Sequence, residues 1–186
     1  MTDSGTITPK RPNGWLRWAL VTVPAIVLLG LLSARLGDSG YGNPWFDRLI
    51  KPEIMPPGWA FPVAWTTLYI LMGFALALII DTRGARWRGI AIALFLFQLA
   101  LNMAWSPVFF GLHRIMLALG LIIAMLFWSV LATMLFWRIR RVAAWLMLPY
   151  LAWLMFAGLL NWQIHKLNPH GMTLVPGPGY TQIIVQ

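Results

Sequence analysis

The chain has 186 residues, of which 60% are hydrophobic and only 10% are charged, and its mean hydropathy is +0.72. Soluble domains contain roughly 45–50% apolar and about 25% charged residues, so this composition excludes a water-soluble globular protein, which would lack the charges to cover its surface. The net charge of +9 comes from basic residues that separate apolar runs, which indicates membrane topology and contact with anionic headgroups of the lipid bilayer and does not predict a nucleic-acid partner.

The predicted elements begin with a polar, proline-containing tail over residues 1–14, which we expect to be disordered. A helix crosses about 30 Å of hydrocarbon in roughly 20 residues. The apolar runs of this length predict five transmembrane helices, at 15–36, 61–80, 89–110, 115–137 and 143–164. The first run is also compatible with a signal peptide, but its length favours a span. These helices form one domain over 15–165, followed by a C-terminal tail over 166–186 that is expected to be extended or disordered.

The loop over residues 37–60 is long and rich in Gly and Pro, yet it contains Trp45, Phe46, Met55 and Trp59. Loops of this length are more often functional than passive connectors, and apolar aromatic side chains in such a loop predict a lid that packs on the bundle. The predicted fold class is therefore an all-α integral membrane protein, a five-transmembrane-helix bundle whose long first loop acts as a lid.

The orientation follows from the basic residues, most of which lie on the N-terminal side of the predicted spans. Cytoplasmic loops carry an excess of Lys and Arg. We therefore expect the N-terminus on the cytoplasmic side and the first loop on the opposite side. The pattern does not distinguish a bacterial inner from an outer membrane.

The third predicted span has two distinct faces. Gln98, Asn102 and Ser106 recur every four residues, so they lie on one face of a helix together with Trp105. Small residues gather on the opposite face, at Gly89, Ala93, Ala100 and Ala104. Small residues let helices approach closely, and this seam is explained either by packing within the chain or by a homodimer interface.

Two further spans carry comparable stripes. Trp65 and Tyr69 share a face of the second span, and Trp153, Ala157 and Asn161 share a face of the fifth. Taken singly, each stripe is explained by ordinary helix packing. Under the predicted topology, however, all three stripes lie at the same depth beneath the 37–60 loop, which predicts a pocket for a large, flat, mostly apolar ligand.

Several classes of chemistry are disfavoured by the same residues. No Asp, Glu, Lys or Arg lies centrally in a predicted span, which argues against a proton relay or coupled transport. His113, His165 and His170 lie at span ends or in the tail, so none is placed to ligate haem iron. The chain has no Cys, and no metal site is expected.

Separated motifs resemble, in the same order, those of the translocator protein family, also called tryptophan-rich sensory protein or peripheral benzodiazepine receptor. The matching segments are Trp45-Phe46, Lys51-Pro52, Pro56-Pro57, Trp59, Trp65, Leu68-Tyr69, Met72-Gly73, Gln98 to Asn102, Trp105, Phe109 to Gly111, Pro149 to Trp153, Phe156-Ala157 and Leu160-Asn161. The resemblance covers about residues 20–165 and implies a bacterial member with the predicted five-helix fold, usually assembled as a homodimer.

The resemblance implies binding of porphyrins, such as protoporphyrin IX and haem, and of synthetic benzodiazepine-site ligands, with no required cofactor. It places the pocket among the first, second, third and fifth spans beneath the first loop. Together with the stripes, it gives these candidate ligand-binding residues: Trp45, Trp59, Trp65, Tyr69, Gln98, Asn102, Trp105, Trp153, Ala157 and Asn161. Eukaryotic members also bind sterols through a motif with a central Tyr, but Trp162 stands at that place here, so tight sterol binding is not expected.

The leading hypothesis is a membrane receptor or sensor that binds porphyrins and modulates tetrapyrrole handling or a stress response. One alternative is an enzyme that degrades porphyrin oxidatively in light, as is reported for some bacterial members of the family. Its catalytic residues would be Trp65 and Trp153. A further alternative is a transporter of porphyrins or sterols.

Overall fold

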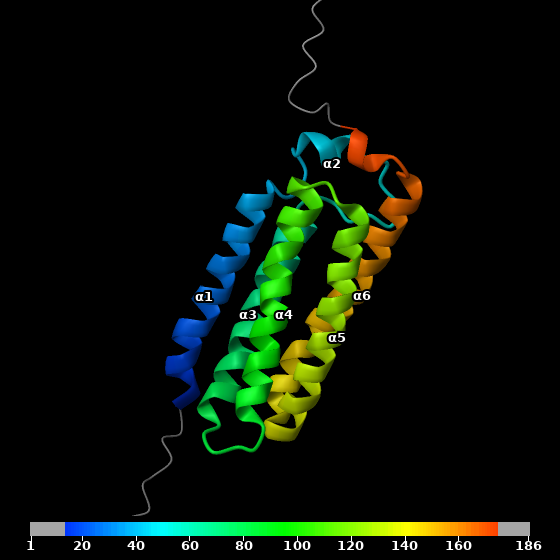
Figure 1. The fold of residues 1–186 in the computed structure, drawn as a ribbon. Coiled ribbons are helices and arrows are strands. Elements are labelled where there is room, and N and C mark those ends of the chain that lie inside the picture. The colour runs from blue at the N-terminus through cyan, green and yellow to red at the C-terminus, as the bar shows by residue number, and fades with distance from the viewer. Residues whose placement is uncertain (1–13, 175–186) are drawn as a thin grey trace, which may run out of the picture.

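The computed structural model describes residues 14–174, and within this range every regular element is a helix. Five helices are long and apolar enough to cross a membrane (Figure 1). They are α1 (Gly14–Gly37), α3 (Ala60–Asp81), α4 (Arg88–Ser106) with its continuation η1 (Pro107–Gly111), α5 (Ile115–Ile139) and α6 (Arg141–Leu167). The all-α, five-span fold class is confirmed, and each helix begins and ends within about a turn of its predicted span.

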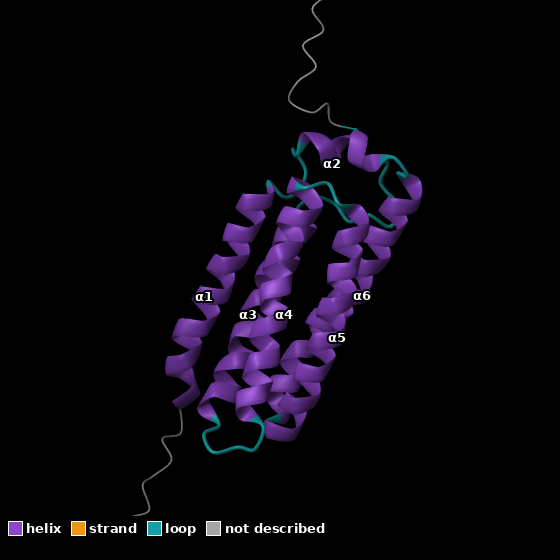
Figure 2. Ribbon diagram, in the orientation of Figure 1, coloured by secondary structure: helices purple, strands orange, loops and turns teal. Residues whose placement is uncertain are grey.

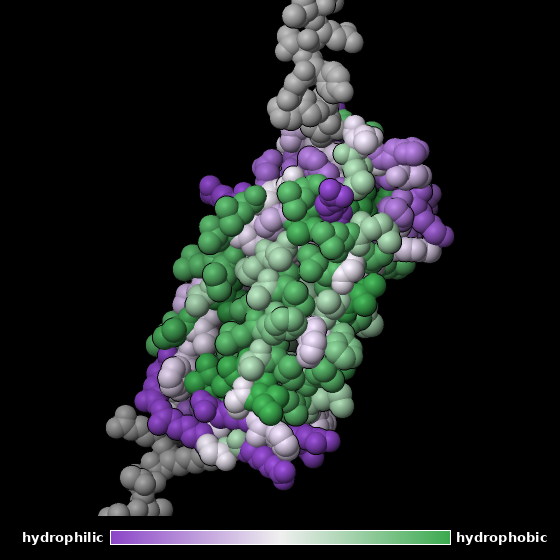
Figure 3. Space-filling model, viewed as in Figure 1, coloured by the Kyte–Doolittle hydropathy of each residue, from purple (hydrophilic) through white to green (hydrophobic). Residues whose placement is uncertain are grey.

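The bundle has two ends that differ in construction. Loops are confined to these ends, and the lid and the C-terminal segment lie together at one of them (Figure 2). A band of apolar side chains covers the middle of the visible face, and polar residues gather at both ends (Figure 3). This arrangement is that of a multi-pass membrane protein, whose apolar side chains contact lipid while its charged side chains stay in the aqueous layers.

The third span changes helix type at Pro107, which the sequence analysis did not anticipate. Proline has no N–H, so the carbonyl of Met103 loses its helical partner. The Ser33 hydroxyl on α1 replaces the missing donor and hydrogen-bonds to the Met103 carbonyl at 2.6 Å. The following turn is a π-helix, Pro107–Gly111, which directs Phe109 and Phe110 into the packing beneath the lid.

The lid contains a short helix, α2 (Pro44–Arg48), which corrects the prediction of a loop without regular structure. Asn43 is its N-cap and accepts hydrogen bonds from the backbone N–H groups of Trp45 and Phe46, and Pro44 occupies the first turn. Both features are known helix-start signals, so the sequence did contain the information.

The C-terminal tail begins later than predicted, and its described part is folded. Helix α6 continues through Lys166 to Leu167, and a 3₁₀ turn, η2 (Gly171–Thr173), follows. Residues 168–174 pack against the lid, so the expectation of an extended or disordered tail is wrong for this stretch. Residues 1–13, which make up nearly all of the predicted N-terminal tail, and 175–186 lie outside the described range.

Helices α1 and α3 approach closely because Gly73 has no side chain. A Cβ at Gly73 would lie 2.6 Å from the Cα of Val23. The approach also permits an interhelical hydrogen bond, in which the Thr22 hydroxyl donates to the Gly73 carbonyl at 2.8 Å. Gly73 therefore serves helix packing and does not line the cavity.

The small-residue seam on α4 faces outward. Gly89, Ala93 and Ala100 are exposed and Ala104 is half-buried, and a Cβ at Gly89 would meet nothing within 4 Å. Packing within the chain, one of the two explanations offered by the sequence, therefore does not explain this seam.

We expect Gly73→Ala to lower the free energy of unfolding by about 1–3 kcal/mol, because the added methyl group forces α1 away from α3. Gly89→Ala is the matched control and should leave stability unchanged or slightly raised. Thermal unfolding in detergent measures both, and equal stability of the two variants would contradict the role assigned to Gly73.

Candidate functional site

A cavity of about 500 Å³ lies at the lid end of the bundle. This volume is within the roughly 300–1,000 Å³ typical of small-molecule sites. All five spans and the lid contribute to its walls, which are mostly apolar and aromatic. The lid contributes Ser39, Gly40, Tyr41, Phe46, Met55 and Gly58.

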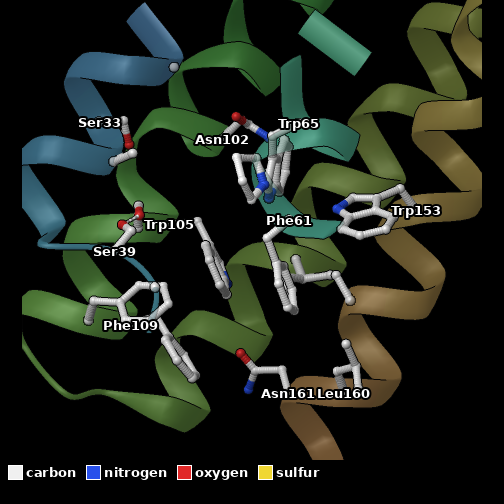
Figure 4. A pocket seen from close by; sticks show the side chains of 18 of the residues that line it. Ser33, Ser39, Phe61, Trp65, Asn102, Trp105, Phe109, Trp153, Leu160 and Asn161 are labelled. Carbon is white, nitrogen blue, oxygen red and sulfur yellow. Dashed lines mark hydrogen bonds between the residues drawn. The ribbon is translucent and has the colours of Figure 1, made fainter. Parts of the chain in front are cut away.

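Seven of the ten candidate residues line this single cavity: Trp65, Tyr69, Asn102, Trp105, Trp153, Ala157 and Asn161. Figure 4 shows Trp65, Trp105 and Trp153 around a shared space, with Asn102 and Asn161 at opposite ends of the labelled group. The three stripes found along the sequence therefore meet in space.

The other three candidates do not line the cavity. Trp45, in helix α2 of the lid, is 1% exposed and stacks on His113 with ring centroids 4.6 Å apart. Trp59 is 69% exposed and precedes α3. Gln98 shares the helical face of Asn102 but lies a turn deeper, where it is fully buried in the core.

A chain of side-chain hydrogen bonds runs from the cavity wall into the core. Tyr69 on α3 donates to the Asn102 side-chain oxygen at 2.9 Å, and the Asn102 amide donates to the Tyr150 hydroxyl at 3.0 Å. Tyr150 and Ser129 both donate to the Gln98 side-chain oxygen, at 2.8 and 3.2 Å. This network joins α3, α4, α5 and α6, and interhelical bonds of this kind contribute about 0.6 kcal/mol each on average.

Three polar atoms at the cavity wall are buried without a hydrogen-bond partner among the described residues. They are the indole N–H groups of Trp105 and Trp153 and the side-chain oxygen of Asn161. Buried polar groups in proteins are nearly always paired. Two donors and one acceptor on side chains of the cavity wall have no partner among the described residues.

The aromatic walls are held by edge-to-face packing. The Trp153 ring lies 6.1 Å from Phe61 and 6.2 Å from Trp65, and both pairs are T-shaped. Trp65 also lies 5.3 Å from Tyr69. The series Phe61, Trp65 and Tyr69 recurs every four residues along α3, so one helical face supplies a continuous aromatic wall.

The lid is tied to the segment that follows α6. The Trp45 indole donates to the Gly171 carbonyl at 2.6 Å, and an Arg48 guanidinium nitrogen donates to the Leu174 carbonyl at 2.8 Å. The Asn168 side chain accepts a hydrogen bond from the Ile50 backbone N–H and donates one to the Ile50 carbonyl, each at 2.9 Å. Burial lowers the pKa of His113, which stacks on Trp45, although a hydrogen bond with the Phe110 backbone opposes that shift.

Sequence reasoning missed several parts of the wall, among them the fourth span, which contributes Ile122 and Met125 although the pocket was expected among the other four spans. Phe61 was detectable, because it stands four residues before Trp65 on the same helical face.

Helix α1 contributes Gly30 and Ser33 to the wall. In a sequence, small residues at this spacing predict close packing of helices and do not by themselves predict a cavity. The family resemblance implied that the first span takes part, but no polar or aromatic stripe marks α1, so only the tertiary structure identifies which of its residues line the cavity.

Comparison with known proteins places the chain in a family. The profile of the TspO/MBR family matches residues 20–167. Protein CrtK of Rhodobacter capsulatus is 42% identical over 128 residues, which cover 67% of this chain and 79% of that protein. Tryptophan-rich protein TspO of Chlorobaculum tepidum is 39% identical over 129 residues (67% and 80%), and the translocator protein of Bos taurus is 36% identical over 162 residues (82% and 96%).

Tyr150→Phe should lower the free energy of unfolding by about 1 kcal/mol, because it leaves the Asn102 amide without its acceptor. Tyr41→Phe is the control, since that hydroxyl is exposed and makes one hydrogen bond of 3.3 Å. Unfolding in detergent compares the two variants. If both lose the same stability, the buried network is not the source of the effect.

Proposed function

The chain belongs to the TspO/MBR family, and from this premise we propose that it is a membrane receptor or sensor that binds porphyrins, such as protoporphyrin IX or haem, in the lid-end cavity. Family membership supports the membrane sensor or receptor role. The observation that carries the choice of ligand is the cavity wall, where three indole rings surround one mostly apolar space of about 500 Å³.

The physical fit is that of a large, flat, apolar ring system. Indole faces offer wide contact surfaces that favour stacked or edge-to-face aromatic partners. Trp105 is itself stacked on Phe109, with ring centroids 5.1 Å apart, so its orientation is fixed before any ligand enters. A wall that is ordered in advance loses little conformational entropy on binding.

The proposal includes a setting in the membrane. We place the N-terminus in the cytoplasm and the lid on the opposite side. In support, Arg17, Arg83, Arg86, Arg138 and Arg141 all belong to the end of the bundle opposite the lid. We also propose a homodimer that pairs through the α4 seam, which is supported by the outward-facing small residues there.

Adding protoporphyrin IX to the purified protein should quench tryptophan fluorescence in a saturable way. Trp65→Phe and Trp153→Phe should each weaken binding about fivefold, because each removes roughly 1 kcal/mol of aromatic contact. Trp145→Phe is the matched control, since that exposed side chain lies outside the cavity. Titrations that are unchanged in both cavity variants would place the binding site elsewhere.

A second candidate function is photo-oxidative porphyrin breakdown, with molecular oxygen as the oxidant. The observation that favours it is the proximity of Trp65 and Trp153, whose ring centroids lie 6.2 Å apart in the cavity wall. Illumination of the protein with protoporphyrin IX in air should then give one defined product. Product formation should fall at least tenfold in either Phe variant when compared at saturating ligand, and equal yields in the variants would leave binding as the function.

A further inference from the structure

The cavity contains polar atoms but no charge. Its described lining includes hydroxyl, amide and indole groups, and no Asp, Glu, Lys, Arg or His. An ionised carboxylate that enters such a space loses its hydration and gains no opposite charge, which is strongly unfavourable. The lining therefore discriminates between the charged and neutral forms of a ligand.

The ammonium group of Lys51, which lies against two lining residues, has carbonyl acceptors within the lid. Lys51 lies over the rings of Phe46 and Tyr41, which line the cavity, with its nitrogen 4.8 and 5.6 Å from their centroids. The same nitrogen lies 3.0, 3.3 and 3.4 Å from the carbonyl oxygens of Phe46, Asp47 and Leu49. An ammonium group has three N–H donors, so none remains for a ligand carboxylate.

Asn161 presents an acceptor to the cavity in a fixed orientation. Its amide nitrogen donates to the Ile115 carbonyl at 2.9 Å. Rotating the amide by half a turn would set two oxygens against each other, so the hydrogen-bond pattern assigns the nitrogen to Ile115. The side-chain oxygen, which is buried and has no partner among the described residues, points toward the space beside Trp105 and Phe61 (Figure 4).

Two indole N–H groups of the cavity wall are hydrogen-bond donors without a partner among the described residues. The Trp105 and Trp153 indole N–H groups are both buried at the cavity wall without an acceptor among residues 14–174. Trp105 and Asn161 together offer one donor and one acceptor around the same space (Figure 4). A carboxylate has only acceptor atoms, so it cannot donate a hydrogen bond to the Asn161 oxygen and would be repelled by it. A neutral carboxylic acid or a carboxamide carries both a donor and an acceptor.

We propose that the cavity selects uncharged ligands and recognises a neutral group that accepts a hydrogen bond from Trp105 and donates one to Asn161. The inference rests on the ligand-binding function proposed above and narrows its ligand class. A porphyrin that carries carboxylic acids enters with the buried acid protonated, and the corresponding ester or amide enters without taking up a proton.

The first test compares protoporphyrin IX with its dimethyl ester on the unaltered full-length protein, by tryptophan quenching between about pH 5 and about pH 8. The dissociation constant of the ester should be independent of pH. That of the free acid should rise about tenfold per pH unit for each carboxyl group that must be protonated on entry. A free acid that binds independently of pH, and at least as tightly as the ester, would overturn the proposal.

The second test compares the dimethyl ester with the bis-carboxamide of the same porphyrin. The amide can donate to Asn161 and the ester cannot, so the unaltered protein should prefer the amide by roughly three- to tenfold. Asn161→Leu should abolish that preference. Trp105→Phe should weaken both ligands and keep the preference, and Trp145→Phe should change neither. No amide preference in the unaltered protein would remove the role of Asn161.

The outcomes separate this inference from the function on which it rests. If the acid, ester and amide all bind but the acid does so without pH dependence, neutral selection is wrong and porphyrin binding stands. If none of the three binds, both proposals fail. Should Asn161→Leu not fold, because the bond to Ile115 is lost, the comparison of acid and ester on the unaltered chain still decides the question.

Discussion

Hydrocarbon offers no water to hydrogen-bond, so the backbone polar groups of a membrane-spanning chain must find their partners within the protein. This constraint makes the spans helical, and it also explains the contacts between them. Pro107 removes the partner of the Met103 carbonyl, and the Ser33 hydroxyl of another helix replaces it. The Thr22 hydroxyl reaches the Gly73 carbonyl at the closest approach of α1 and α3.

Against this background, the polar side chains of the bundle divide into two groups. Those toward the core, on Tyr150, Gln98 and Ser129, hydrogen-bond to one another and join the helices, although the Gln98 side-chain nitrogen has no partner among the described residues. Three side chains at the cavity, Trp105, Trp153 and Asn161, each have one buried polar atom without a hydrogen-bond partner among residues 14–174. The first group joins the helices of the bundle, and the second is the group to which we assign the proposed ligand preference. Asn102 and Tyr69 belong to the first group although they line the cavity, so the wall and the core are one hydrogen-bonded unit.

The lid is a folded part of the same structure. Its aromatic side chains, Trp45 and Phe46, pack with Phe109 and Phe110 of the π-helical turn, and the segment after α6 holds it from the other side. The residues that close the cavity therefore come from segments far apart in the sequence.

The sequence by itself determined the fold class, the five spans and seven of the residues that line the cavity at the lid end. Composition and run length define membrane helices, and a spacing of four residues sets side chains such as Trp65 and Tyr69 on one face. Only the tertiary structure decided which polar residues face the cavity, because Gln98 and Asn102 share a face and differ in depth. It also decided that the Trp45 indole joins the lid to Gly171, and that the Asn161 amide nitrogen bonds Ile115 while its oxygen has no partner within the described part of the chain.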